Sequence, residues 1–281
     1  MSRTSRSGAL ALPALVAFAA NSLLCRRALG LGLIDPASFT SIRLVSGTIA
    51  LAVIAAAIRR SQPRQGSWAS ALMLFSYAAT FSASYVRIGA GPGSFLLFGS
   101  VQAAMLGWGV VRGERPTLPQ WTGIIVAVAG LAALTLPGSH APDRIGAALM
   151  ICAGISWAVY SIRGRKSVDA VVTTADNFLR TVPLTAALSL GSMSSAHLTT
   201  SGIFLAVASG AIASGLGYIL WYAALPSLSA TQAAAVQLSA PILAASGAVL
   251  FLGERLTLRL LGSGAAILCG VWLAIQRPKR R

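Results

Sequence analysis

The sequence predicts an all-α membrane protein of ten transmembrane helices, arranged as two inverted five-helix repeats. Three observations lead to this prediction. Only 10% of the 281 residues are charged, whereas 56% are hydrophobic and the mean hydropathy is +0.75. A soluble domain usually carries about 25% charged residues, so this chain cannot cover a water-facing surface. The apolar residues also form long blocks, and one short motif occurs once in each half of the chain.

Ten apolar blocks divide the chain, and each is close to the ~20 residues with which a helix crosses a hydrocarbon core of ~30 Å. Lipid offers the backbone no hydrogen-bond partner, and the alternation typical of barrel strands is absent, so we expect helices. The gaps are short, which predicts one compact bundle, and ten spans are enough to enclose one cavity, so we expect a monomer. The blocks are Ala9–Leu24, Pro36–Ile58, Trp68–Val86, Gly93–Val111, Pro119–Leu136, Ile145–Ile162, Ala170–Leu190, Gly202–Leu225, Ala230–Leu252 and Leu260–Ile275.

The first block has two interpretations. Basic residues Arg3 and Arg6, an apolar run and the triplet Ala17-Phe18-Ala19 together are typical of a signal peptide with its cleavage site. The run continues apolar to Leu24, and the sixth block has a similar pattern, which favours a retained helix.

The distribution of Lys and Arg predicts the orientation of the blocks. With the N-terminus in the cytoplasm, fourteen of the 22 basic residues fall on the cytoplasmic side and six on the outer side. We therefore expect a multi-pass protein of the inner (plasma) membrane with both termini cytoplasmic. The pair Arg26-Arg27 falls on the outer side and argues against this orientation. The net charge of +16 then reflects topology and not nucleic acid binding, because the basic residues lie between apolar blocks.

An internal repeat organises the blocks into two halves. The segment Gly113–Leu118 (GERPTL) follows the fourth block, and Gly253–Leu258 (GERLTL) follows the ninth, 140 positions later; at the same offset Gly130 matches Gly270. We expect repeats over residues 8–137 and 145–276. Five spans are an odd number, so the second repeat must enter the membrane from the opposite side, as in many secondary transporters. A duplication that only supplied a stable bundle is the alternative.

The carboxylates of the two repeated segments, Glu114 and Glu254, follow a Gly at the end of a block and precede an Arg. Their matched placement predicts a structural role, either capping the next helix or pairing locally. A role in ion coupling is the alternative, although both residues should lie near the interface.

The second half carries further residues that point to a family. It reads Gly215-Leu216-Gly217-Tyr218-Ile219-Leu220-Trp221-Tyr222-Ala223-Ala224-Leu225, passes through Pro241, and reaches Gly253-Glu254-Arg255-Leu256-Thr257. This pattern resembles the EamA domain of the drug/metabolite transporter superfamily. The first half is looser: Val101 stands where the family usually has Pro, and Tyr85–Gly93 replaces the usual linker. The resemblance implies ten helices, cytoplasmic termini, a central cavity between the halves, and transport of small metabolites, often export of amino acids.

Two arginines fall within apolar blocks. Arg43 lies about two turns into the second block, and an Arg in hydrocarbon costs about 2.5 to 3.5 kcal/mol on insertion scales, so it should face the bundle interior. There it would bind a substrate carboxylate or phosphate; the alternative is an Arg that fixes helix ends or extends to the interface. Arg180 follows Asp176 by four residues, so the two can pair, either structurally or as a coupling site for protons.

Polar and aromatic side chains inside the blocks complete the predicted site. Amides need partners in an apolar span and should face inward, and Tyr and Trp give a cavity apolar walls with polar edges. Helix–helix contacts and an interfacial belt are the alternatives. The expected substrate-binding residues are Asn21, Arg43, Tyr77, Gln102, Trp157, Tyr218 and Gln237.

Other classes of protein find little support. The three cysteines, Cys25, Cys152 and Cys269, are too far apart in sequence for a metal motif, and the histidines, His140 and His197, fall in outer loops. No paired carboxylates suit an intramembrane enzyme, and no phosphate-binding loop suits ATP drive. The sequence thus predicts a secondary transporter, an exporter of small amino-acid-like solutes working by alternating access, with no cofactor or metal. A membrane scaffold or a channel is the main alternative, and an intramembrane enzyme is a lesser one.

Overall fold

The computed structural model describes residues 3–57, 65–111, 117–135, 142–227, 237 and 239–275. Over these residues the chain is helical, with one isolated β-bridge between Ile34 and Leu198 and no strand, which confirms the all-α fold class. The elements are α1 (Arg3–Gly30), α2 (Pro36–Ala57), α3 (Trp68–Tyr85), α4 (Ala90–Val111), α5 (Leu118–Thr135), α6 (Arg144–Gly164), α7 (Ala170–Gly191), η1 (Met193–Ser195), α8 (Thr200–Val207), η2 (Ala208–Leu216), α9 (Gly217–Ala224), η3 (Leu225–Ser227), α11 (Ser239–Leu252) and α12 (Leu258–Ile275).

Two helices differ from the predicted blocks. Helix α1 runs past Leu24 to Gly30, because Arg26 finds partners there: its Nη1 donates to the Tyr85 carbonyl oxygen at 2.8 Å. The triplet Ala17-Phe18-Ala19 lies within this continuous helix, and Phe18 belongs to the core. The eighth block is one rod of three pieces, in which the π-helix η2 separates α8 from α9. Of the ninth block, Gln237 and α11 are described.

The outer surface of the bundle is apolar. Large hydrophobic side chains stand exposed on several helices, among them Val111, Leu118, Leu250 and Phe251. Helices α1, α2, α4 and α6 and the rod Thr200–Ala224 are long and apolar enough to cross a membrane, and α5, α11 and α12 are shorter apolar helices. Among the described residues α3 and α7 are in neither group; α7 carries Asp176, Asn177 and Arg180. The chain is thus a multi-pass membrane protein.

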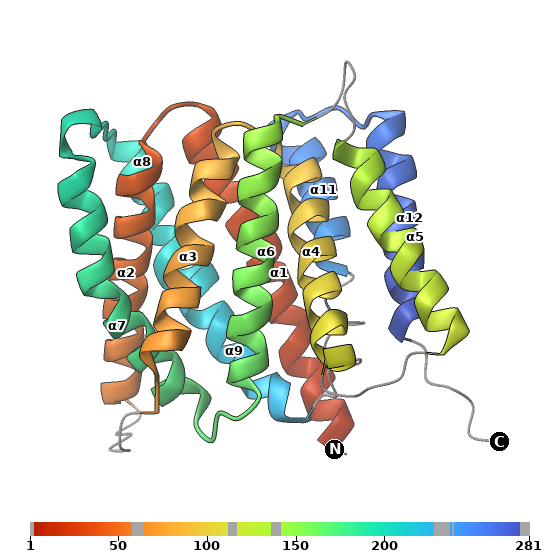
Figure 1. Cartoon of the computed structure of the whole chain (residues 1–281). Helices are drawn as coiled ribbons and strands as arrows, with labels where there is room; N and C mark the ends of the chain where they lie inside the picture. The colour runs from red at the N-terminus through yellow and green to blue at the C-terminus, as the bar shows by residue number, and fades with distance from the viewer. Residues whose placement is uncertain are drawn as a thin grey trace.

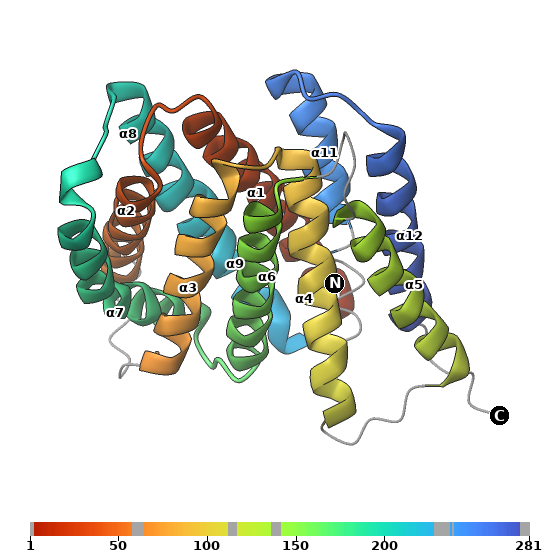
Figure 2. The ribbon, with the colours of Figure 1, turned by 45° about the horizontal axis from the view of Figure 1, so that its top comes forward.

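The helices pack as two equivalent sets. By order along the chain, the counterparts are α1 and α6, α2 and α7, α3 and the α8–η2–α9 rod, α4 and α11, and α5 and α12. Three of these pairs pack against each other: α2 on α7, α4 on α11 and α5 on α12. Two further contacts match, since α3 packs on α6 as the rod packs on α1, and α4 packs on α6 as α11 packs on α1. Figures 1 and 2 show α2 and α7 on one flank and α5 and α12 on the other.

The repeated glycines lie where α5 and α12 touch. A Cβ built on Gly130 would stand 3.0 Å from the Ile267 backbone nitrogen, and one on Gly270 would collide with the Ala127 backbone. Each repeat therefore presents its glycine to the backbone of the other, and the small residues allow this close approach.

Counterpart helices run in opposite directions: Figure 1 shows α1 rising where α6 descends, and α2 descending where α7 rises. This is the arrangement of inverted repeats. We call the end of the bundle where α1 begins and α6 ends, near Gly164, the vestibule end, after the cavity described below. We call the opposite end, near Gly30 and Ala90, the sealed end, after the contacts of Glu254 described below.

Candidate functional site

Arg43 lies fully buried between the two halves, with 0% of its side chain exposed. Its Nε donates to Ser214 Oγ at 3.0 Å, and its Nη2 donates to Tyr218 Oη at 2.8 Å and to Tyr77 Oη at 3.4 Å. Its Cζ also stands 5.2 Å from the centroids of both the Tyr77 and Phe81 rings. The side chain therefore faces the interior, and the alternative in which it reaches the interface is wrong.

The π-helix explains how Ser214 reaches this guanidinium. Within Ala208–Leu216 the helix widens, and α2 presses against it at Gly210, where a Cβ would collide with the Arg43 carbonyl oxygen and Ser46 Oγ. π-helical turns are rare and frequent at functional sites. A run of small residues thus lets the Arg43 backbone approach the second half closely.

Asn21 extends the cluster toward α1. Its Nδ2 donates to Tyr77 Oη at 3.4 Å, and its Oδ1 accepts from Ser209 Oγ at 2.6 Å. Tyr77 Oη therefore receives hydrogen bonds from both Asn21 and Arg43, and the three side chains form one buried polar cluster.

Aromatic rings surround the polar cluster. Trp157 lies at its centre, with ring centroids 4.7 Å from Tyr218, 5.0 Å from Tyr77 and 5.3 Å from Phe18. Edge-on and tilted pairs at these separations are favourable contacts. Five predicted site residues thus come together: Asn21, Arg43, Tyr77, Trp157 and Tyr218.

The other two predicted residues, Gln102 and Gln237, are buried, but within the described part of the chain they are not among the groups that bond or stack with Arg43. Sequence reasoning missed Ser214, Phe18 and Phe81. Ser214 carried no distinguishing signal among the small residues of its segment, and Phe18 was read only as part of the cleavage-like triplet.

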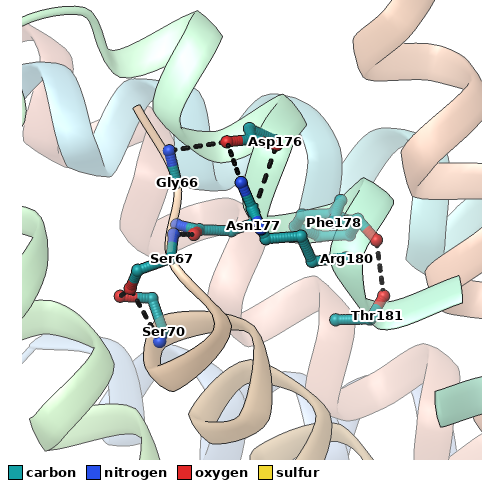
Figure 3. A network of polar contacts seen from close by, with 8 residues as sticks. All are labelled: Gly66, Ser67, Ser70, Asp176, Asn177, Phe178, Arg180 and Thr181. Carbon is teal, nitrogen blue, oxygen red and sulfur yellow. Dashed lines mark hydrogen bonds and ion pairs between the residues drawn. The ribbon is translucent and has the colours of Figure 1, made fainter. Parts of the chain in front are cut away.

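Asp176 and Arg180 pair as predicted, with Arg180 Nε 3.3 Å from Asp176 Oδ1. Figure 3 shows that Asp176 and Asn177 also hold the segment before α3. Asp176 Oδ2 accepts from the Gly66 backbone N–H at 2.8 Å, and Asn177 Oδ1 accepts from the Ser67 backbone N–H at 3.1 Å. This network therefore links the two halves near the vestibule end, and a coupling role for Asp176 stays a prediction.

The centre of the bundle is collapsed. The space between Phe18, Tyr77, Leu97 and Trp157 measures about 10 Å³, which is room for one water at most. A much wider cavity of about 1050 Å³, the vestibule, opens among the vestibule-end parts of α3, α4, α6, α7 and α9.

The vestibule is basic. Arg163, Arg165 and Lys166 line it, and no carboxylate is among the described residues of its wall. Arg163 is held by two hydroxyls from the start of α3, since its Nε donates to Ser70 Oγ at 2.9 Å and its Nη2 to Ser67 Oγ at 3.0 Å. A wall of one sign raises the local concentration of anions.

A layer of rings separates the vestibule from Arg43. Tyr222, which lines the vestibule, packs against Gly164, where a Cβ would collide with its ring, and its Oη donates to the Tyr160 carbonyl oxygen at 3.0 Å. Tyr160 in turn stands 5.5 Å from Trp157, measured between ring centroids. A solute in the vestibule would have to displace these rings to reach Arg43.

Glu254 has a different partner from the one predicted. It does not cap α12, whose first turn is capped by Thr257 Oγ1, which accepts from the Leu260 N–H at 3.1 Å. Instead its carboxylate accepts from the backbone N–H groups of Ala90 at 2.6 Å and Gly91 at 3.0 Å, at the start of α4. The matched positions of Glu114 and Glu254 in the repeat could not show that Glu254 contacts α4 in the other half. Glu114 lies outside the described residues.

Comparison with known proteins identifies relatives of the whole chain. A protein of Pseudomonas aeruginosa is 46% identical over 95% of this chain and 93% of its own length. A Streptantibioticus cattleyicolor protein named "Probable terminal-alkyne amino-acid exporter" is 26% identical over 85% of this chain and 84% of its own. A solved crystal structure shares the fold, with a TM-score of 0.69 at 18% identity, over 97% of this chain and 98% of the other.

The family match covers both halves separately. Residues 6–136 and residues 144–276 each match the EamA-like transporter family. Membership in this family indicates transport. The chain belongs to the EamA-like transporter family, within the drug/metabolite transporter superfamily, and is a transporter of that type.

Proposed function

We propose that this protein is a secondary exporter of small amino-acid-like metabolites, working by alternating access between its two halves. In this proposal ten helices span the inner membrane as inverted repeats, the vestibule end and both termini face the cytoplasm, and one chain is the working unit. The solute enters the vestibule, binds at Arg43 and leaves through the sealed end. The S. cattleyicolor relative, named "Probable terminal-alkyne amino-acid exporter", supports the class of substrate.

The buried charge of Arg43 is the observation that carries the proposal. Its guanidinium is bonded to hydroxyls and rings, no carboxylate pairs with it in the described structure, and its Nη1 has no hydrogen-bond partner there. An uncompensated intramembrane cation is costly, and a substrate carboxylate would supply both the missing charge and a charge-assisted hydrogen bond.

The surrounding rings suit the rest of such a solute. Phe18, Tyr77, Trp157 and Tyr218 offer flat apolar faces on which an apolar or unsaturated side chain can pack. Asn21 Oδ1, bonded to Ser209 in this structure, could accept from a substrate ammonium group after a small rearrangement. These rings fill the centre now, so binding requires them to separate.

Export and proteoliposome assays test this proposal. The strain would overexpress the protein, and efflux of an amino-acid panel, including one with a terminal alkyne, would be followed by mass spectrometry. We expect Arg43→Gln to abolish flux. Arg43→Lys should lower it at least tenfold, because Lys keeps the charge but cannot reproduce the planar fork. Arg87→Gln is the matched control, because it removes the positive charge of an exposed ion pair with Asp143.

Unchanged flux in Arg43→Gln at normal expression would refute the role of Arg43. Conductance far above carrier rates would favour a channel. The central space of about 10 Å³ leaves no room for a continuous aqueous path in this state.

A further inference from the structure

The sealed end is held by one carboxylate that joins four segments. Glu254, in the α11–α12 connection, accepts from two N–H groups at the start of α4, and its Oε1 lies 3.7 Å from Arg26 Nε near the end of α1. Arg26 also donates to the carbonyl oxygen of Tyr85, the last residue of α3. We call Glu254, Arg26 and the Ala90–Gly91 backbone the Glu254 cluster.

The local sequence is shaped to admit this carboxylate. Gly253 ends α11 with a φ of +67°, a left-handed conformation that favours glycine, and this turns the next residue toward α4. A Cβ on Gly89 would stand 2.8 Å from Glu254 Oε2, so a larger residue there would push the carboxylate away. An anion at a helix N-terminus is stabilised by the free N–H groups and the helix dipole.

Other contacts between the halves occur at both ends of the bundle. For α2 and α7, the Asp35 N–H donates to the His197 carbonyl oxygen at the sealed end, and Asp176 holds Gly66 at the vestibule end.

Partial burial alone would raise the pKa of the Asp35 carboxyl, but hydrogen bonds from Ser38, His197 and Ala37 outweigh it and lower the pKa.

Helices α3 and α6 are likewise bonded at both ends. Ser84 Oγ donates to the Gly146 carbonyl oxygen at 2.7 Å at the sealed end, and Arg163 bonds Ser67 and Ser70 at the vestibule end. These two helix pairs therefore cannot by themselves decide which end is open. Glu114, which matches Glu254 in the repeat, lies outside the described residues, so the structure describes such a carboxylate at the sealed end alone.

We propose that the Glu254 cluster is a conformational latch: it holds the sealed end shut while the vestibule is open, and it must release before the solute can leave there. The inference rests on the alternating access proposed above, but it concerns the protein without a solute. Release separates the start of α4 from the α11–α12 connection, which opens the bundle above Arg43 and closes the vestibule.

Cys25 supplies a native reporter of this opening. It precedes Arg26 in α1 and is fully buried, whereas Cys152 and Cys269 are exposed on the outside of the bundle. Removing the latter two by Cys152→Ala and Cys269→Ala leaves one thiol, directly beneath the latch. A second version, with Cys25→Ala and Val159→Cys added, places the only thiol on the vestibule wall.

The experiment measures labelling rates of both full-length versions in lipid nanodiscs with a water-soluble maleimide, without any solute. We expect Glu254→Gln to raise the Cys25 rate about tenfold, the factor that corresponds to ~1.4 kcal/mol, and to lower the Val159→Cys rate. Arg26→Gln should act in the same direction and more weakly. Arg87→Gln, at the same end, should change neither rate.

Two results would overturn the latch. One is an unchanged Cys25 rate in both Glu254→Gln and Glu254→Ala. The other is a rise at both thiols together, which reports a loosened fold. Because no solute is needed, a reciprocal change of the two rates would support the latch even if the export assays failed.

Discussion

At the scale of single residues, the structure gives the two intramembrane arginines different kinds of partner. Among the described residues, Arg43 is surrounded by hydroxyls and rings and no carboxylate pairs with it, whereas Arg180 has Asp176 at 3.3 Å and the Trp68 ring centroid 5.5 Å from its Cζ. The spacing of Asp176 and Arg180 made their pairing predictable, because residues four apart share a helix face. The partners of Arg43 were not predictable, since Ser214 lies 171 positions away.

Asp176 is expected to act as a structural group. Asp176→Asn should lower the melting temperature in detergent, because Arg180 loses its ion pair and the Gly66 N–H loses a charged acceptor. The cost should be about 1–3 kcal/mol. Thermal unfolding followed by fluorescence measures it, and transport measured from pH 5 to 8 should keep its profile. A displaced profile would instead assign Asp176 to proton coupling.

At the scale of helices, the lengths of the apolar blocks predicted most elements, while the interruptions of the helices follow from tertiary contacts. No local signal marks Ala208–Leu216 as π-helical; its geometry depends on the approach of α2 at Gly210. The extension of α1 to Gly30 depends likewise on partners of Arg26 in distant segments. The match between Gly130 and Gly270 indicated the repeat. It could not show that each glycine packs against the helix that carries the other.

That contact gives a matched pair of glycine substitutions on α12. Gly270→Ala should destabilise the fold by about 1–3 kcal/mol, because the added methyl collides with the Ala127 backbone. Gly262→Ala meets nothing within 4 Å and should be neutral or stabilising by up to about 1 kcal/mol. Thermal unfolding of the two purified variants compares them. Equal melting temperatures would mean that the helices adjust their separation freely.

At the scale of the whole molecule, the repeat made the two-half architecture predictable, and the packing supports it through matched helix pairs. The closed centre and the open vestibule were not predictable, because both repeats carry similar sequences and which end is open depends on contacts such as those of Glu254. The distribution of Lys and Arg over the gaps between blocks predicted an orientation in the membrane. It did not show at which end of the bundle the cavity opens.

Fusion proteins test the proposed topology. Green fluorescent protein attached after Arg281 should fluoresce, because it folds in the cytoplasm, and alkaline phosphatase inserted near His197 should be active on the outer side. Inactive phosphatase at His197, together with active phosphatase at the C-terminus, would reverse the orientation and assign the vestibule to the outer side.

The long separation between Arg43 and its partners also constrains how the protein is made. A ribosome completes α2 well before it synthesises Ser214 and Tyr218, which lie 171 and 175 positions further along. During that interval the nascent first half holds an intramembrane guanidinium without two of its three hydroxyl partners. Biogenesis must therefore shelter this charge, in the insertion machinery or in a hydrated gap, until the second half arrives.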